Sequence, residues 1–142
     1  MAKKLCVVGL GYIGLPTAVM FADHGFHVLG VDINEDAVRK LNNKELHIEE
    51  PGLLERLSAT IDKGLFRAST TPEAADVFIL AVPSPIRDDK TANLDYIRAA
   101  AKSVVPFLQK GNLIILESAV TPRTVEDVLI LLLKESHLQI VE

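Results

Sequence analysis

The sequence predicts an α/β protein in which helices cover both faces of a doubly wound parallel sheet, giving one domain of three layers. Short apolar runs of strand type alternate along the chain with stretches whose apolar residues recur at helical spacing. The first run, at residues 5–8, enters a turn with three glycines, and the second, at residues 27–31, ends in Asp32. A glycine-rich turn followed about 20 residues later by an acidic residue is typical of the Rossmann fold and of a dinucleotide site.

The composition agrees with a single cytoplasmic domain. The chain has 142 residues, of which 49% are hydrophobic and 24% charged, so it can bury a core of ordinary size. A net charge of −4 argues against nucleic acid or an anionic membrane surface as a partner, because both are bound mainly through surplus Lys and Arg. The densest apolar run, residues 128–133, is too short to span a bilayer.

Each glycine of the first turn has its own expected role. Gly9 permits the tight turn, Gly11 lets the backbone lie against a pyrophosphate, and Gly14 lets the following helix pack closely on the strand. That helix would point unpaired N–H groups and the positive end of its dipole at the pyrophosphate, so no basic residue is needed. Asp32 would meet the ribose hydroxyls. The alternative is that the glycines only permit the turn and that Asp32 only caps a helix.

Hydrophobic spacing and capping residues predict the remaining elements in chain order. Those of the first half are a helix after the glycine turn that ends near residues 23–25, a helix from Asn34 to about residue 42, an extra helix between Gly52 and Gly64, a strand at 66–70 and a short helix beginning at 71–73. Those of the second half are a strand at 77–82, a helix across 94–108 whose last turn Pro106 disturbs, a strand at 113–116, a helix across 125–133 and the beginning of a strand at 138–141. Ligands of such sheets lie beyond the carboxyl ends of the strands, so the exits to examine are residues 9–14, Asp32, 83–84 and 117–120.

Several of these segments resemble one protein family, in order along the chain. They read Gly9-Leu-Gly-Tyr-Ile-Gly-Leu-Pro-Thr17, Val31-Asp-Ile-Asn34, His47-Ile-Glu-Glu-Pro-Gly-Leu53, Arg67-Ala-Ser-Thr-Thr-Pro72, Ala81-Val-Pro-Ser-Pro85 and Glu117-Ser118. Together they are similar to the amino-terminal, NAD-binding domain of the nucleotide-sugar 6-dehydrogenases, and most similar to the UDP-N-acetyl-D-mannosamine dehydrogenases. The resemblance covers essentially the whole chain.

The resemblance implies an activity and a set of cofactor contacts. Family members oxidise the C6 alcohol of a UDP-sugar to a carboxylate with two NAD⁺ molecules, for the synthesis of surface polysaccharide, and their full-length chains are homodimers. The residues implied to contact NAD are Tyr12, Ile13, Asp32 and Ser84, which join Gly9, Gly11 and Gly14 of the turn. Ser84 stands where the family usually has Thr, and this exchange keeps the hydroxyl.

Two departures limit what the resemblance implies for this chain. The family's usual Glu-Ser-Thr after the fifth strand reads Glu-Ser-Ala at residues 117–119, so a hydroxyl that contacts the cofactor is lost at Ala119. The family's nucleophilic Cys, its catalytic Lys and Asn, the central dimerisation helix and the UDP-binding domain all lie beyond the matched region. We therefore expect residues 1–142 to bind NAD without turnover, to meet a UDP-sugar only together with those other domains, and to hold no catalytic residue. The oligomeric state of this chain stays open.

Other polar residues carry separate expectations. Cys6, the one cysteine, lies in the first strand and is predicted to be a small buried apolar residue without reactivity. The four histidines have no metal-ligand spacing, so no metal site is expected and surface or capping roles suffice for them. The acidic pairs at 49–50 and 88–89 suit solvated loops, whereas Arg87 either reaches a phosphate or faces water.

A protein of another class is the alternative to a dehydrogenase domain. Stand-alone nucleotide-sensing regulatory domains, such as those that gate potassium transport, have a similar length and also pair a glycine turn with an acidic residue after the second strand. The segments at residues 47–53 and 82–85 suit the dehydrogenase better.

Overall fold

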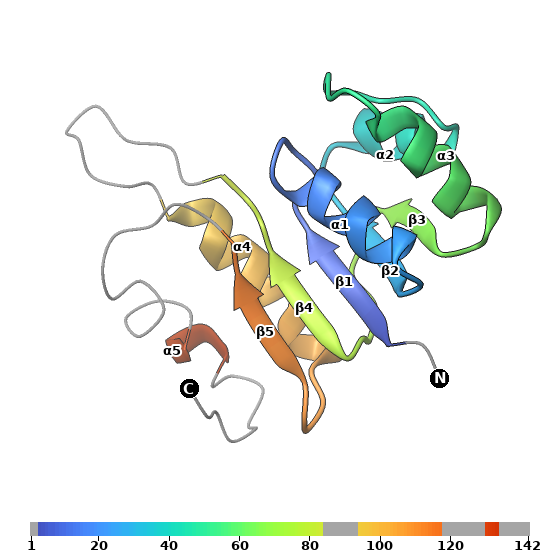
Figure 1. Cartoon of the computed structure of the whole chain (residues 1–142). Coiled ribbons are helices and arrows are strands. Elements are labelled where there is room, and N and C mark those ends of the chain that lie inside the picture. Colours follow the sequence, from blue (N-terminus) through green and yellow to red (C-terminus); the bar gives the residue numbers. More distant parts are fainter. Residues whose placement is uncertain (1–2, 84–93, 118–129, 134–142) are drawn as a thin grey trace.

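The computed structural model describes residues 3–83, 94–117 and 130–133 (Figure 1). Its strands are β1 (Lys4–Val8), β2 (His27–Val31), β3 (Phe66–Ser69), β4 (Val77–Leu80) and β5 (Leu113–Leu116). They pair in parallel in the order β3-β2-β1-β4-β5. The chain winds from β1 through β2 to β3 and then returns to the other side of β1 as β4, which confirms the predicted doubly wound sheet.

Helices cover both faces of the sheet, as the three-layer prediction requires. They are α1 (Gly14–Asp23), α2 (Glu35–Asn42), α3 (Leu53–Asp62), α4 (Asp95–Val104), the short 3₁₀ helix η1 (Val105–Phe107) and α5 (Ile130–Leu133). One core cluster joins α1, α2 and α3 to the sheet, and the other joins α4 to the opposite face, where Figure 1 shows α4 behind β4. Along β1, Leu5 and Val7 belong to the first cluster, whereas Cys6 and Val8 belong to the second. Both faces are therefore buried at the central strand β1, as in parallel sheets generally.

The strands end level with one another at the carboxyl edge of the sheet. Val8, the last residue of β1, pairs with Val31 of β2 and with Leu80 of β4. The hydrogen bonds continue one residue further, because the Gly9 N–H donates to the Val31 oxygen over 2.7 Å and the Ala81 N–H donates to the Val8 oxygen over 2.7 Å. This register brings the glycine turn, the exit of β2 and the exit of β4 together.

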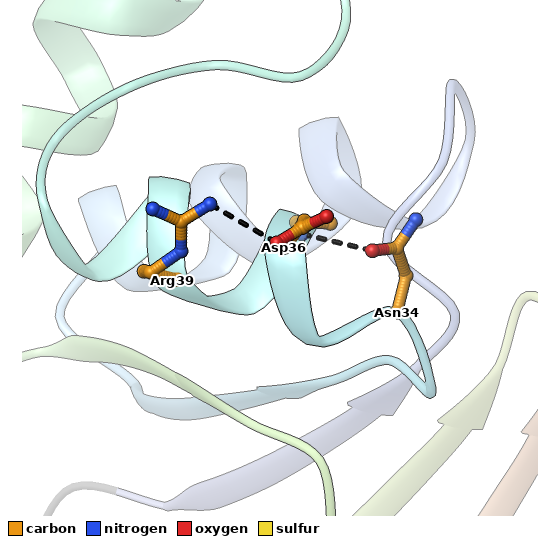
Figure 2. Close-up of polar contacts among 4 residues, drawn as sticks. Asn34, Asp36 and Arg39 are labelled. Carbon is orange, nitrogen blue, oxygen red and sulfur yellow. Dashed lines mark hydrogen bonds and ion pairs between the residues drawn. The ribbon is translucent and has the colours of Figure 1, made fainter.

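The predicted N-cap of α2, Asn34, is present, and an ion pair that was not predicted lies on the first turns of the helix. The Asn34 side chain accepts a hydrogen bond from the Ala37 N–H over 3.1 Å, and Arg39 lies 3.0 Å from the Asp36 carboxylate (Figure 2). The helix ends where Lys44 takes a positive φ of 62°. The chain then forms the extra helix α3, which was also predicted from the sequence.

The prediction of a short helix beginning at residues 71–73 is wrong. Residues 70–76 contain no helix, and they run from the carboxyl edge of the sheet to its amino edge, where the Asp76 N–H donates to the Lys4 oxygen over 2.9 Å. A helix rises only about 1.5 Å per residue, whereas extended chain covers about 3.3 Å. So few residues cross the sheet only when they are extended.

The elements of the second half that the structure describes agree with the prediction, with small differences in their bounds. The strand predicted to end at residue 82 ends at Leu80, and the helix predicted across 94–108 changes after Val104 to the 3₁₀ helix η1, which contains Pro106. Two side chains of β5 are exposed, Leu113 at 55% and Ile115 at 39%, because no described element covers them. The strand expected at 138–141 and most of the helix expected at 125–133 lie outside the described residues. No helix in the described ranges is long and apolar enough to cross a membrane.

Candidate dinucleotide-binding site

A cleft of about 760 Å³ lies beyond the carboxyl ends of β1, β2 and β4. It is lined by the glycine turn, by Asp32, by residues 81–83 and by one face of α4 between residues 96 and 103. This is the crevice at the switch in strand order where open α/β sheets bind their ligands. Of the four strand exits singled out in the sequence, residues 9–14 and Asp32 are fully described, whereas Ser84 and residues 118–120 of the other two lie outside the described residues.

Two glycines of the turn are required by the fold itself. Gly9 has a φ of +103°, and a Cβ there would lie 2.6 Å from the Ala81 oxygen. A Cβ on Gly14 would overlap the Gly9 oxygen and lie 3.1 Å from the Ala81 Cβ. Gly11 differs, because an added Cβ would meet nothing within 4 Å and would stand at the cleft. The protein's own packing therefore does not require a glycine at position 11, and the missing side chain leaves the backbone there exposed to the cleft.

The amino end of α1 opens toward the same cleft. Its N-cap residue, Ile13, makes no side-chain hydrogen bond to the helix, and the first turn holds no acidic residue. Within the described residues, no hydrogen bond is made by the N–H groups of Gly11, Tyr12 or Ile13. Uncapped N–H groups and the positive end of the helix dipole together suit a diphosphate.

Asp32 is held rigidly at the edge of the cleft. One carboxylate oxygen accepts the Leu10 N–H over 3.0 Å, and the other accepts the Asn34 N–H over 2.9 Å. No Lys or Arg among the described residues lines the cleft. A ribose would therefore find an anchored acceptor for its hydroxyls, whereas a 2′-phosphate would face a carboxylate with no basic residue to offset it.

Tyr12 and Ile13 also lie on this cleft, and they are exposed at 69% and 53%. Large apolar side chains held outside the core at a binding turn suit contact with a ligand. The structure thus brings Gly9, Gly11, Tyr12, Ile13, Gly14 and Asp32 to one place. Their contacts with a cofactor stay predictions, as does that of Ser84, which with Arg87 and Ala119 lies outside the described residues.

His47 is a residue of the cleft that was not predicted from the sequence. A surface or capping role was expected, and that interpretation is wrong, since the ring lines the cleft and its Nε2 lies 2.6 Å from the Leu10 oxygen. The ring's Nδ1 is buried and has no hydrogen-bond partner in the described part of the chain. The sequence feature that could have indicated a role for His47 is the family-like motif at residues 47–53, which begins with this histidine.

A second unpredicted contact joins distant parts of the chain. The Thr17 hydroxyl, on α1, donates to the Glu117 carboxylate over 3.0 Å, and the Glu117 N–H donates to the Leu80 oxygen over 2.8 Å. Helix α1 is therefore tied to the exits of β4 and β5, which keeps the glycine turn in register with them.

Cys6 behaves as the sequence predicted. The side chain is fully buried, and burial raises the pKa of its thiol to about 11. A thiol that stays protonated and inaccessible is a poor nucleophile. The acidic pair at residues 49–50 is exposed, as expected for a solvated loop, and the other pair lies outside the described residues. Within the described residues, no cluster of three His, Cys, Asp or Glu side chains could hold a metal ion.

These features define a dinucleotide-binding domain of the Rossmann type. A parallel sheet, a glycine turn, an uncapped helix and an anchored acidic residue meet at the switch in strand order.

The chain belongs to the UDP-glucose/GDP-mannose dehydrogenase family, whose NAD binding domain matches residues 3–141. A UDP-N-acetyl-D-mannosamine dehydrogenase of Methanococcus maripaludis is 46% identical over 130 residues, which are 89% of this chain and 30% of that protein. An NDP-N-acetyl-D-galactosaminuronic acid dehydrogenase of Ralstonia solanacearum is 48% identical over 116 residues, which are 82% of this chain and 27% of that protein.

A solved structure shares the fold closely. The UDP-N-acetyl-mannosamine dehydrogenase of Staphylococcus aureus superposes with a TM-score of 0.94 at 48% identity, over 97% of this chain and 34% of that one. This chain thus spans about a third of the length of the relatives that it matches. The cofactor of the matched domain is NAD, and the anchored Asp32 and the uncapped α1 fit it. The regulatory alternative loses its support, because the matched family is one of dehydrogenases.

Proposed function

We propose that this domain holds NAD⁺ for a UDP-N-acetyl-D-mannosamine dehydrogenase that converts the C6 alcohol of its sugar to a carboxylate. The observation that carries the cofactor role is the cleft itself, where the uncapped amino end of α1 and the anchored Asp32 face one space. The choice of sugar is supported by the activity for which the Methanococcus and Staphylococcus relatives are named. The Ralstonia relative, named for a different amino sugar, is comparably similar, so the choice of sugar has a test of its own below.

The proposed overall reaction balances with two molecules of cofactor. One alcohol, two NAD⁺ and one water give one carboxylate, two NADH and three protons. Bound NAD⁺ would supply the hydride acceptor for each oxidation. In this chain the N–H groups of residues 11–13 would hold its diphosphate, and Asp32 would orient the adenosine ribose. The Thr17–Glu117 hydrogen bond would keep these groups aligned with the exit of β5.

We further propose that the 142-residue chain alone binds NAD without turnover. Oxidation of an aldehyde to an acid by this route needs a nucleophile that traps the aldehyde and a base within reach of the alcohol. The chain has one cysteine, and burial in β1 with a pKa of about 11 makes it unsuitable. The whole protein is proposed to be a cytoplasmic homodimer whose other domains supply the nucleophile and the UDP site.

The test has two parts. Isothermal titration of the purified chain with NAD⁺ should show binding, and a failure to bind would refute the cofactor role. Addition of NAD⁺ with UDP-N-acetyl-D-mannosamine or UDP-glucose should produce no NADH absorbance. Sustained turnover, from material shown by mass to be this chain alone, would refute the inactivity. The whole protein, purified from cell extract and identified by its mass, should oxidise UDP-N-acetyl-D-mannosamine faster than UDP-glucose, and the opposite preference would refute the choice of sugar.

A further inference from the structure

The second residue of the glycine turn, Leu10, is anchored by three separate contacts. Its N–H donates to Asp32 over 3.0 Å, and its carbonyl oxygen lies 2.6 Å from the His47 Nε2. Its side chain is fully buried over Gly30 of β2, where an added Cβ would lie 2.9 Å from a Leu10 methyl group. Only the contact with His47 acts on the carbonyl side of the residue.

This difference matters because of how a peptide unit rotates. The Leu10–Gly11 peptide turns about Leu10 ψ and Gly11 φ, and neither the Leu10 N–H nor its side chain restrains those angles. Gly11 adds no steric wall, since a Cβ there would have nothing within 4 Å. Within the described residues, the hydrogen bond from His47 is the one hydrogen bond made to the C=O or N–H of this peptide, while the next carbonyl, that of Gly11, accepts from the Leu15 N–H over 3.1 Å.

The direction of the Gly11 N–H follows from that plane. The peptide is trans, since no cis peptide is present in the described part of the chain, so the N–H points opposite to the Leu10 carbonyl. With the carbonyl turned toward His47, the Gly11 N–H is turned away from it. Gly11 lines the cleft, so the same plane sets the direction in which the turn presents its first free N–H group, that of Gly11.

His47 itself is placed by the segment between α2 and α3. The next residue, Ile48, is buried in the core cluster beneath α1, which anchors the ring over the turn. A carbonyl oxygen only accepts, so Nε2 carries the proton of this hydrogen bond. The ring's other nitrogen, Nδ1, is buried without a partner in the described residues. Burying an unsatisfied polar atom costs free energy, and a cost of this kind at a binding cleft fits a functional role for His47.

We propose that His47 is a positioning residue of the NAD site, which presets the Leu10–Gly11 peptide so that the turn receives the cofactor's diphosphate. The inference rests on the NAD-binding role of this cleft. His47 need not contact the cofactor, since it acts through the Leu10 carbonyl.

The variants separate the hydrogen bond from the bulk of the ring. His47→Leu keeps apolar volume without a donor, whereas His47→Gln places an amide N–H at a reach similar to that of Nε2. His24→Ala is the matched control, because His24 also bonds a backbone carbonyl, that of Met20 over 2.8 Å, but at the far end of α1. Titrations use NAD⁺ and, as a probe without a diphosphate, adenosine.

His47→Leu should bind NAD⁺ about tenfold more weakly, because the variant loses the one hydrogen bond that orients the Leu10–Gly11 peptide before the cofactor binds. Its affinity for adenosine should not change, and His47→Gln and His24→Ala should bind both probes as the unchanged chain does. In ¹⁵N–¹H spectra without ligand, the Gly11 amide signal of His47→Leu should shift or broaden, whereas the Gly64 signal should stay in place.

Three results would overturn the inference: NAD⁺ affinity unchanged in His47→Leu, equal losses for NAD⁺ and adenosine, or no recovery in His47→Gln. If His47→Leu fails to fold by circular dichroism, His47→Asn takes its place, because the shorter amide falls short of the Leu10 carbonyl. Failure of the unchanged chain to bind NAD⁺ would instead refute the proposed function, so the two failures are distinguishable.

Discussion

The three glycines of the turn differ in why they lack a side chain, and a pair of substitutions exposes the difference. Gly11→Val puts a side chain where an added Cβ meets nothing within 4 Å, at the wall of the cleft. Gly14→Ala puts a Cβ into the Gly9 oxygen and within 2.9 Å of the Gly9 carbonyl carbon. The first change should therefore act on binding and the second on folding.

The expected magnitudes follow from those contacts. Overpacking against movable side chains typically costs about 1–3 kcal/mol, but the obstacle to Gly14→Ala is backbone, so α1 must withdraw from the turn. Withdrawal would loosen Leu15, Ala18 and Val19, which are all fully buried, and we expect a loss of unfolding free energy on the order of 3 kcal/mol or more. Gly11→Val should change the unfolding free energy by less than about 1 kcal/mol. It should weaken NAD⁺ at least about 100-fold, equivalent to about 2.7 kcal/mol, because the side chain stands between backbone and diphosphate.

Urea unfolding followed by circular dichroism measures the first quantity, and isothermal titration with NAD⁺ on the same preparation measures the second. A folded Gly11→Val chain that binds NAD⁺ normally would show that the turn is structural only. A Gly14→Ala chain as stable as the unchanged one would show that the close approach of α1 to β1 is not needed.

Three further predictions test other parts of the structure. The chain should prefer NAD⁺ to NADP⁺, and Asp32→Ala should narrow that preference, because the carboxylate that repels a 2′-phosphate is removed; equal titration curves for both cofactors with the unchanged chain would contradict the role of Asp32. Lys44→Gly should raise the unfolding free energy by about 0.5 kcal/mol. Glycine removes the cost of a left-handed backbone at this position, about 1 kcal/mol, and this gain exceeds the free energy lost with the exposed Lys44–Asp62 ion pair. A lower urea midpoint would refute this. The Cys6 thiol, whose pKa is raised to about 11, should resist alkylation by iodoacetamide at pH 8 in the native chain and react readily in guanidinium; rapid native labelling would disprove its burial.

The sequence by itself determined the order of the elements and the place of the site. Strand and helix periods are local properties, so the run at residues 27–31 and the helix after Asn34 were predicted within a residue or two. The parallel class followed from their alternation, and it puts the turn and Asp32 at one edge of the sheet. The glycines were informative for the same reason, because the missing Cβ of Gly9 or Gly14 is a property of a single position.

Tertiary structure alone decided what depends on residues far apart in the chain. Residues 71–76 are extended because they must cross the sheet, which no local pattern reports. The Thr17–Glu117 contact joins positions separated by 100 residues, and His47 reaches Leu10 across 37. A histidine's spacing says nothing about which carbonyl it will meet, because the packing of the segment between α2 and α3 sets that partner. The sequence therefore predicts that a diphosphate binds at this turn, whereas the contacts that hold the turn ready for it exist only once the sheet and its helices have assembled.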